Sequence, residues 1–446
     1  MTAALASGSV HRHLVALTVP MVWGVLAMMA FNVVDTWFVA QLGDRELAAM
    51  SFTFPVVMVL ISLGIGLMAG TSSVLALAIG AGHTERVKRL STDALLGATA
   101  LAIVLTAAGL ATMEPLFTLL GADDAVRPLV LEYMTVWYAG FVFVLVPMVG
   151  FGALRAVGDS KVQGTIFLVA SIANAALDPL LIFGLGAWGG LGLRGAAIAT
   201  VCSRALTMAA AYWAMNHKHD LLARSLPTAR QFWRSTVSVF HVGLPAAGTN
   251  MIIPAATAAI VALMAEYGSH AVAAFGAATR IEQLTLVPFY ALSAVIGPFV
   301  GQNLGAGEHG RVREAMRACG LFCMGLGLLT ALLLAVGAEP VMGLFTEDPR
   351  VLDIGRTYLW IVPLSNGAYG VVMVVNASFN GLGKPGPGVA ISVIRMMVLY
   401  LPLAWVGARL VDVPGIFVGA CIANLIAGAV AYGWIARATR LESSDA

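Results

Sequence analysis

Charged residues are scarce in this sequence, and this scarcity limits the possible folds. Asp, Glu, Lys and Arg make up 11% of the 446 residues, whereas 59% are hydrophobic. A soluble globular domain carries about 25% charged residues, so this composition cannot supply a surface that faces water on all sides. It excludes a soluble globular protein. The net charge of +2 gives no indication of a nucleic-acid partner.

Cysteines and catalytic motifs are also scarce. The four cysteines lie in apolar stretches, and Cys319 and Cys323 are four residues apart, which is not a metal or redox spacing. The sequence contains no Walker loop, no GxSxG elbow and no HExxH motif. We therefore expect no catalytic residues, no metal site and no cofactor. A membrane-embedded enzyme is the weakest alternative, because no nucleophile and base are paired at membrane depth.

Apolar stretches of about 20 residues, the length that spans a bilayer, recur along the whole chain. They leave no room for a sizeable soluble domain. The sequence therefore predicts an all-α membrane protein. We predict twelve transmembrane helices, at 14-39, 52-79, 91-112, 132-152, 165-184, 191-215, 237-264, 271-301, 317-337, 357-379, 389-407 and 414-436.

The distribution of Lys and Arg predicts the orientation of these helices. With both termini placed in the cytoplasm, sixteen Lys and Arg residues fall in the inner segments and six in the outer loops. Membrane proteins concentrate positive charge in their cytoplasmic loops. We therefore expect a multi-pass protein of the cell inner membrane with both termini cytoplasmic.

The sequence repeats itself at an offset of 225 residues, and the register holds without a gap from position 20 to position 158. Six helices per half is an even number, so the repeats are parallel. We predict a lobe of helices 1-6 over 1-215, a cytoplasmic linker over 216-236 and a lobe of helices 7-12 over 237-446. A pseudo-twofold axis, a central cleft and alternating access are expected of this plan.

The matched pairs include Pro20 and Pro245, Arg86 and Arg311, Glu114 and Glu339, Asp123 and Asp348, Tyr133 and Tyr358, and Gly158 and Gly383.

Two aspartates lie at similar depths in the first lobe. An ionisable residue inside a membrane helix costs several kcal/mol, so Asp35 and Asp178 are candidate functional residues. At about 1.5 Å of rise per residue, both lie about 6–9 Å below the outer surface. Asn174 precedes Asp178 by four residues and shares its helix face, and Thr200 lies in the same outer half.

Two carboxylates that face each other in a weakly solvated cavity cannot both stay ionised at low cost. That arrangement suits proton or Na⁺ coupling. The structural alternative is that both acids bridge helices or bind helix ends.

A third acid, Glu282, lies near the middle of its predicted helix, and Arg395 is its expected partner. A buried ion pair that fixes helix packing and a role for substrate cations or protons are equally compatible with this pattern. The offset of 225 residues pairs Asp35, Asp178 and Glu282 with Ile260, Leu403 and Val57. The acids are therefore not duplicated, whereas the glycines and prolines are.

Pro20 has no N–H to donate and should weaken the first helix about fifteen residues from Asp35. We therefore assign Pro20 a conformational role. Its counterpart Pro245 indicates that the kink is at least partly an architectural feature of both halves.

Four segments together resemble the multidrug and toxic compound extrusion (MATE) family over nearly the whole chain. They are FNVVDTWFVAQLG, NAALDPLLIFG followed by GAAIATVCSRA, TRIEQLTLVPFYALSAVIGPFVGQNLGAG, and FNGLGKPG. The resemblance is strongest to the DinF branch. It implies a cation site of Asp35, Asn174, Asp178 and Thr200, and a bending proline at Pro20.

The chain departs from other branches of that family. The NorM branch has acids in helices 7 and 10, but 237-264 and 357-379 contain none, and 132-152 lacks the asparagines of some archaeal relatives. Because Na⁺ is a hard cation that requires several oxygen ligands, these departures favour H⁺ over Na⁺ as the coupling ion.

The sequence thus predicts a monomeric, cation-coupled antiporter that lies among membrane lipids and exports amphipathic or cationic drugs and dyes. The alternative is a lipid-linked precursor flippase of the same wider superfamily. That function requires several arginines for a pyrophosphate, and only Arg280 and Arg395 could serve.

Overall fold

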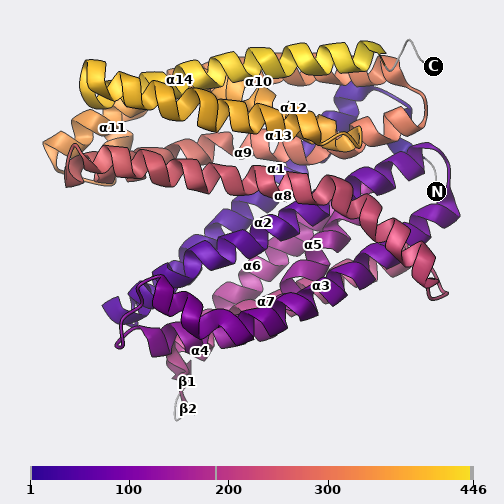
Figure 1. The fold of residues 1–446 in the computed structure, drawn as a ribbon, viewed down its shortest axis with the longest axis horizontal. Coiled ribbons are helices and arrows are strands. Elements are labelled where there is room, and N and C mark those ends of the chain that lie inside the picture. Colours follow the sequence, from indigo (N-terminus) through magenta and orange to yellow (C-terminus); the bar gives the residue numbers. More distant parts are fainter. Residues whose placement is uncertain (1–2, 186–187, 442–446) are drawn as a thin grey trace. The chain divides into compact units, whose positions relative to one another are not determined.

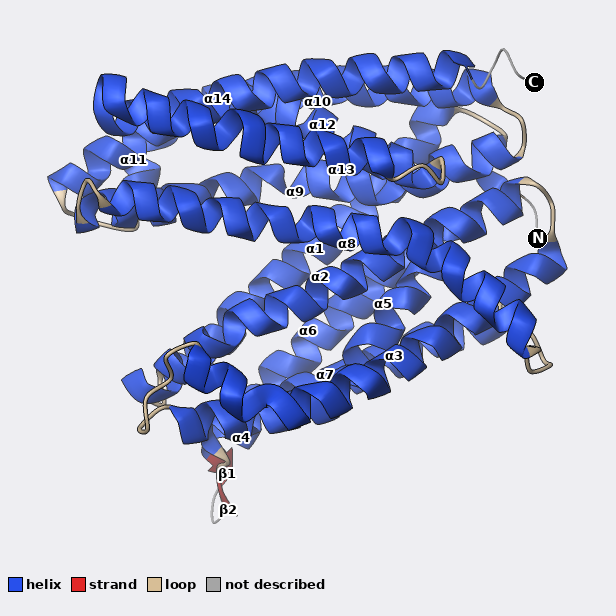
Figure 2. Cartoon of the chain, viewed as in Figure 1, coloured by secondary structure: helices blue, strands red, loops and turns tan. Residues whose placement is uncertain are grey.

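The computed structural model describes residues 3–185 and 188–441, and nearly all of them are helical (Figures 1 and 2). The elements of the first half are η1 (Ala4–Ala6), α1 (Val10–Ala40), α2 (Asp44–Gly80), α3 (Thr84–Leu119), α4 (Arg127–Ala139), α5 (Phe141–Ala156), α6 (Ser160–Phe183), β1 (Gly184–Leu185), β2 (Trp188–Gly189), α7 (Gly192–Trp213) and η2 (Ala214–Lys218). Those of the second half are α8 (Ala229–Ala265), α9 (Ser269–Gly305), α10 (His309–Gly343), α11 (Pro349–Ile361), η3 (Val362–Ser365), α12 (Asn366–Gly381), α13 (Gly386–Val393), η4 (Ile394–Tyr400) and α14 (Leu401–Leu441).

The helices correspond to the predicted membrane spans. Within the described residues, nine helical segments are long and apolar enough to cross a membrane, and the bent pair α4 and α5 forms a tenth. The ninth segment holds two predicted spans, because α14 leaves the helical conformation at Val411 and Asp412. The remaining predicted span is α7. The predicted fold class, an all-α membrane protein of twelve spans in two six-helix lobes, is confirmed.

The chain forms two compact units. Unit 1 covers Val19–Ala247, and unit 2 joins Ala3–Thr18 to the chain from Gly248 onward. The lobe and linker boundaries given above remain predictions. The chain passes from one unit to the other within α1 and again within α8, in each case within three residues of a duplicated proline, Pro20 or Pro245. A proline removes one helical hydrogen bond, so α1 and α8 are each weakened near the place where the chain crosses from one unit to the other.

Unit 1 is held together by close approaches of helix backbones. A Cβ at Gly152 of α5 would lie 2.5 Å from the carbonyl oxygen of Met68 in α2. Small residues permit such contacts, which supply the van der Waals packing that joins membrane helices. Large buried side chains of α4 and α5, among them Trp137, Phe141 and Leu145, complete the core.

The predicted span 132-152 is not one straight helix. α4 and α5 are bent by 46° at Gly140. A Cβ at Gly140 would lie 2.3 Å from Cγ2 of Val201, so the backbone at the bend packs closely against α7. Sequence analysis did not predict this bend, because a single glycine in an apolar helix does not indicate a break.

Unit 2 centres on α12, which packs against α9, α10 and α14. A Cβ at Gly381 would lie 2.3 Å from the carbonyl oxygen of Gly297. The two parts of α14 on either side of the break also approach closely, since a Cβ at Gly415 would lie 2.0 Å from the carbonyl oxygen of Gly407. Asp412 turns the chain with a positive φ of 55°.

The N-terminal segment is tied to unit 2. The Arg311 guanidinium donates hydrogen bonds to the carbonyl oxygens of Leu5, Ser7 and Gly8, at 3.0, 3.3 and 2.6 Å. Asn303 donates to the Leu5 carbonyl oxygen at 3.2 Å and accepts from Nε of Arg311 at 2.7 Å. These bonds explain why residues before Thr18 belong to unit 2 although α1 continues into unit 1.

Candidate functional site

Two buried aspartates define the candidate site in unit 1. Asp35 comes from α1 with 5% of its surface exposed, and Asp178 comes from α6 and is fully buried. Asn174 lies one helical turn before Asp178 and donates from Nδ2 to its Oδ1 at 3.2 Å. The i,i+4 spacing places both polar groups on the same face of α6. The two carboxylates are near enough for their charges to interact.

Several oxygen atoms of this site lack a protein partner. Oδ1 of Asp35, Oδ1 of Asn174 and Oδ2 of Asp178 are buried, and none accepts a hydrogen bond from the described residues. Buried polar atoms are nearly always hydrogen-bonded, and leaving one unpaired costs about 1–3 kcal/mol. The site therefore presents a cluster of acceptors that a proton or another cation would satisfy.

Tyr133 of α4 adds a phenol to this group. It is 5% exposed, and its phenol group lies within electrostatic range of both Asp35 and Asp178. Arg204 of α7 interacts with Asp35 through its charge, and its guanidinium carbon lies 5.1 Å from the centre of the Phe31 ring. Sequence analysis had noted Tyr133 as a duplicated residue and had not assigned it to the site.

Thr200, the fourth predicted residue, is buried on α7, which packs along α6. Within the described residues, its hydroxyl makes no hydrogen bond to either carboxylate. Its role at the site therefore stays a prediction.

Pro20 lies where the backbones of α1 and α6 approach each other closely. A Cβ at Gly164 of α6 would lie 2.7 Å from the Pro20 carbonyl oxygen, and a Cβ at Gly24 would lie 3.0 Å from Cα of Gly164. About two turns beyond the contact between Pro20 and Gly164, the hydroxyl of Ser171 donates to the carbonyl oxygen of Ala27 at 3.1 Å. α1 therefore lies against α6 from Pro20 toward Asp35, so a change in its bend at Pro20 would alter the same helix interface that carries the acids.

Glu282 belongs to a separate polar group in unit 2. Its Oε2 accepts a hydrogen bond from the hydroxyl of Tyr358 at 2.5 Å, which joins α9 to α11. No ion pair between Glu282 and Arg395 occurs among the described residues, although the Arg395 charge acts on the glutamate. The direct partner is thus a tyrosine that the sequence did not indicate.

Arg395 is buried in η4, a π-helix, and has its own partners. Nη1 donates to Oδ1 of Asn424 at 3.1 Å, and Asn424 donates to Oγ of Ser365 at 3.0 Å. The guanidinium carbon lies 4.2 Å from the centre of the Tyr369 ring, and Nε has no protein partner. π-helical segments are rare and often occur at functional sites. This group therefore presents a buried cation beside an aromatic ring.

Two bundles of membrane-spanning helices, each with buried polar groups, define the molecule as an integral membrane protein with the architecture of a transporter. The MatE family model matches residues 20–180 and again residues 245–406. The second match begins 225 residues after the first, in agreement with the internal repeat. The chain belongs to the MatE family, whose members found here are transporters.

Named relatives match almost the whole chain. A protein of Shewanella oneidensis named FAD transporter is 37% identical over 96% of this chain and 95% of its own length. The probable multidrug resistance protein YpnP of Bacillus subtilis is 26% identical over 90% of both chains. The Vibrio cholerae MATE transporter VcmN in its bent form superimposes with a TM-score of 0.92 at 32% identity, covering 97% of this chain and 98% of VcmN.

Proposed function

We propose that this protein is an antiporter that exports amphipathic, often cationic, organic molecules in exchange for protons. The observation that carries the proposal is the cluster of unpaired buried oxygens on Asp35, Asn174 and Asp178. A proton on either carboxylate would relieve repulsion between the two acids and turn an unpaired acceptor into a donor. Such a site has a different hydrogen-bond pattern with and without the proton.

Protons fit this site better than Na⁺. Hard metal cations bind through several oxygen ligands. Asp35 and Asp178 supply carboxylates and Asn174 supplies one amide oxygen, while the Thr200 hydroxyl makes no hydrogen bond to either acid within the described residues. A proton needs only one carboxylate oxygen, so the small number of converging oxygens favours H⁺.

Proton binding at the two aspartates can change the bend of α1. Protonation changes the polar contacts between α1 and α6, and α1 has a weak point at Pro20, where one helical hydrogen bond is missing. Gly164 allows the Pro20 carbonyl to approach α6. A change in the bend of α1 would then alter the space that substrate occupies in unit 1.

A second candidate substrate is a flavin dinucleotide. The Shewanella oneidensis relative is named FAD transporter and is more similar to this chain than the multidrug relatives given above. Arg395, with its unpaired Nε and the adjacent Tyr369 ring, supplies groups that bind a phosphate and a flat aromatic system. The pyrophosphate of such a substrate is chemically related to that of the lipid-linked precursors considered as the alternative.

Transport in reconstituted proteoliposomes tests the proposal. An imposed proton gradient should drive movement of ethidium, a cationic dye, and an imposed Na⁺ gradient alone should not. Asp35→Asn and Asp178→Asn should each lower proton-driven transport by about 100-fold, because an amide cannot carry the proton. The matched control is Asp124→Asn, the same chemical change at a side chain that is 93% exposed.

Transport assays in the same vesicles distinguish between the candidate substrates. Preferential transport of FAD that depends on Arg395 would favour the flavin reading, and movement of a fluorescent lipid-linked pyrophosphate would favour the flippase. Unchanged proton-driven transport in both aspartate variants would refute the coupling mechanism whichever substrate is moved.

A further inference from the structure

A large cavity in the described part of the chain lies in unit 2, away from the polar groups considered so far. It has a volume of about 1370 Å³. α10 and the second part of α14 form its walls, and Ala368 and Val371 of α12 form its floor. A Cβ at Gly428 would lie 2.9 Å from Cβ of Ala368, so α14 rests directly on this floor. The result is a groove along the helices rather than a closed chamber.

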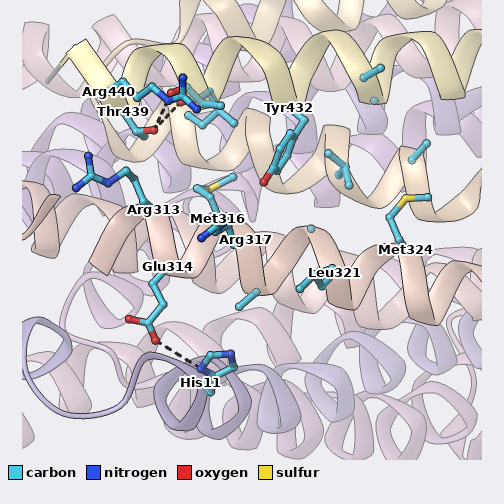
Figure 3. A pocket seen from close by; sticks show the side chains of 18 of the residues that line it. His11, Arg313, Glu314, Met316, Arg317, Leu321, Met324, Tyr432, Thr439 and Arg440 are labelled. Carbon is cyan, nitrogen blue, oxygen red and sulfur yellow. Dashed lines mark hydrogen bonds and ion pairs between the residues drawn. The ribbon is translucent and has the colours of Figure 1, made fainter. Parts of the chain in front are cut away.

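One end of the groove is strongly basic. Arg313 and Arg317 of α10 and Arg440 of α14 line it there, and all three are exposed. Among the described residues that line the groove, Glu314 is the one acidic side chain, and it lies 3.6 Å from Nδ1 of His11 (Figure 3). Among the described residues, three arginines and one glutamate therefore line this end of the groove.

The rest of the groove is apolar. Figure 3 shows Leu321 and Met324 toward the end away from Arg313 and Arg440, with Tyr432 between. Leu321 and Met324 are 76% and 51% exposed, as expected of side chains that face lipid. Eleven residues separate Arg313 from Met324, which at about 1.5 Å of rise per residue gives an apolar path of about 16 Å.

We propose that this groove binds an anionic phospholipid. Its phosphate would lie among Arg313, Arg317 and Arg440, and one acyl chain would extend along α10 and α14 past Tyr432 toward Met324. Basic pockets between transmembrane helices bind anionic lipid headgroups. The groove combines positive charge at the end of the helices with an apolar path at membrane depth, and a small soluble anion would use only the first of these. Arginine is suited to this role because its planar guanidinium matches a phosphate group.

A lipid in this groove would be separate from the proposed transport site. Neither the Asp35 site nor Arg395 contributes a side chain to the groove. The lipid would occupy a place on unit 2 that stays the same whether the exported molecule is a dye or a flavin.

Native mass spectrometry of the full-length protein in detergent tests the proposal. The probes are dioleoylphosphatidylglycerol and dioleoylphosphatidylcholine, which share their acyl chains and differ in net charge. We expect tighter binding of the anionic lipid by about tenfold or more. Each of Arg313→Gln, Arg317→Gln and Arg440→Gln should weaken that binding by about fivefold, because a basic residue at the membrane surface contributes about this factor.

The chain offers a matched control for each part of the groove. Arg437→Gln removes the same charge from the same turn of α14 at an exposed residue that does not line the groove, and it should change binding by less than about twofold. Ala429→Phe places a ring in the apolar path without changing a charge, and should weaken binding by about tenfold through the loss of acyl contacts. Ile426→Phe adds an aromatic ring on the same helix outside the groove.

Equal binding of the two lipids by the unaltered protein would overturn the proposal without any variant. An equal loss in Arg437→Gln and Arg440→Gln would show general surface attraction and also overturn it. Displacement of phosphatidylglycerol by inorganic phosphate would assign a phosphate site in place of a lipid site. The expected result is charge selectivity that phosphate does not abolish and that both groove changes reduce.

Discussion

Unit 1 and unit 2 carry a tyrosine at the same position of the internal repeat, yet the two tyrosines have different surroundings. Tyr358 donates a hydrogen bond to Glu282. Tyr133 lies within electrostatic range of Asp35 and Asp178. The acids come from different helices: α9 provides Glu282, whereas α1 and α6 provide Asp35 and Asp178. Each unit thus has its own tyrosine at the duplicated position, and the acids that interact with that tyrosine differ between the units.

The duplicated arginine shows the same divergence. Arg311 binds the N-terminal segment through three carbonyl oxygens. Arg86, its counterpart, is exposed, and the described residues provide no hydrogen-bond or ion-pair partner for it. Duplication therefore preserved the positions of side chains, and the partners at those positions changed afterwards. Paired substitutions at equivalent positions can measure how far the two units have diverged.

The largest difference is expected at the duplicated arginine. Arg311→Gln removes the hydrogen bonds that fix residues 5–8 to α10, and hydrogen bonds to a charged group each contribute about 1.5–3 kcal/mol. Because the guanidinium is partly exposed, we expect a loss of about 3 kcal/mol for the whole group. Arg86→Gln should change stability by less than about 0.5 kcal/mol. Thermal unfolding in detergent measures both.

A second variant distinguishes this contact from a general effect of charge. Asn303→Ala removes the amide that binds both Leu5 and Arg311 and should reproduce part of the loss. Equal destabilisation by Arg86→Gln and Arg311→Gln would contradict the idea that the two arginines have diverged.

A smaller difference is expected at the duplicated tyrosine. Tyr358→Phe removes the hydroxyl that donates to Glu282, so its effect should overlap with that of Glu282→Gln. A double-mutant cycle should give a coupling of about 2 kcal/mol for this pair. Tyr133 and Asp178 share no recorded hydrogen bond, and the same cycle with Tyr133→Phe and Asp178→Asn should give less than about 1 kcal/mol.

Unfolding free energies of the four single and two double variants supply both cycles. Equal coupling in the two units would mean that the tyrosines have kept one role. That result would contradict the idea that the surroundings of Tyr133 and Tyr358 have diverged.

Sequence reasoning succeeded where a single helix carried the information. Apolar length predicted the spans. The cost of burying a carboxylate made Asp35 and Asp178 candidate functional residues, and that role stays a prediction. The four-residue spacing predicted that Asn174 would lie beside Asp178, and the structure records that hydrogen bond. The pairing of Asp35 with Asp178 followed from their equal depth, because depth is a property of each helix by itself.

Sequence reasoning failed where contacts join different helices. Tyr358 meets Glu282 only because α11 packs against α9. The approach of Pro20 to Gly164 depends on the rotation of α1 and α6 about their axes, which apolar helices with weak amphipathic patterns do not reveal. Tyr133 was noted only as one of the duplicated residues and was not assigned to the site. A buried tyrosine near unpaired acids is the signal that could have been used.

The smallest difference is expected at the position that follows the duplicated Gly158 and Gly383. Unit 1 has Asp159 there and unit 2 has Lys384. Asp159 accepts from Lys218 and His219, at 2.7 Å each, and caps α6 by accepting from the Val162 N–H at 3.2 Å. Burial raises the pKa of Asp159, but the hydrogen bonds from His219 and Lys218 outweigh it and hold that pKa well below its usual value.

The lowered pKa determines how stability depends on pH. The contribution of Asp159 is fully present above the unfolded pKa of about 3.8 and is lost as pH falls through the lower folded value. Asp159→Asn keeps the cap and removes the charge, so we expect a loss of about 1 kcal/mol at pH 7. The difference in unfolding free energy between the variant and the unaltered protein should disappear as the pH falls below about 4. Lys384→Gln, the change at the equivalent position of unit 2, removes no group that titrates there and should show no such pH dependence. A difference that persists unchanged into acid would mean that the carboxylate charge of Asp159 does not stabilise unit 1.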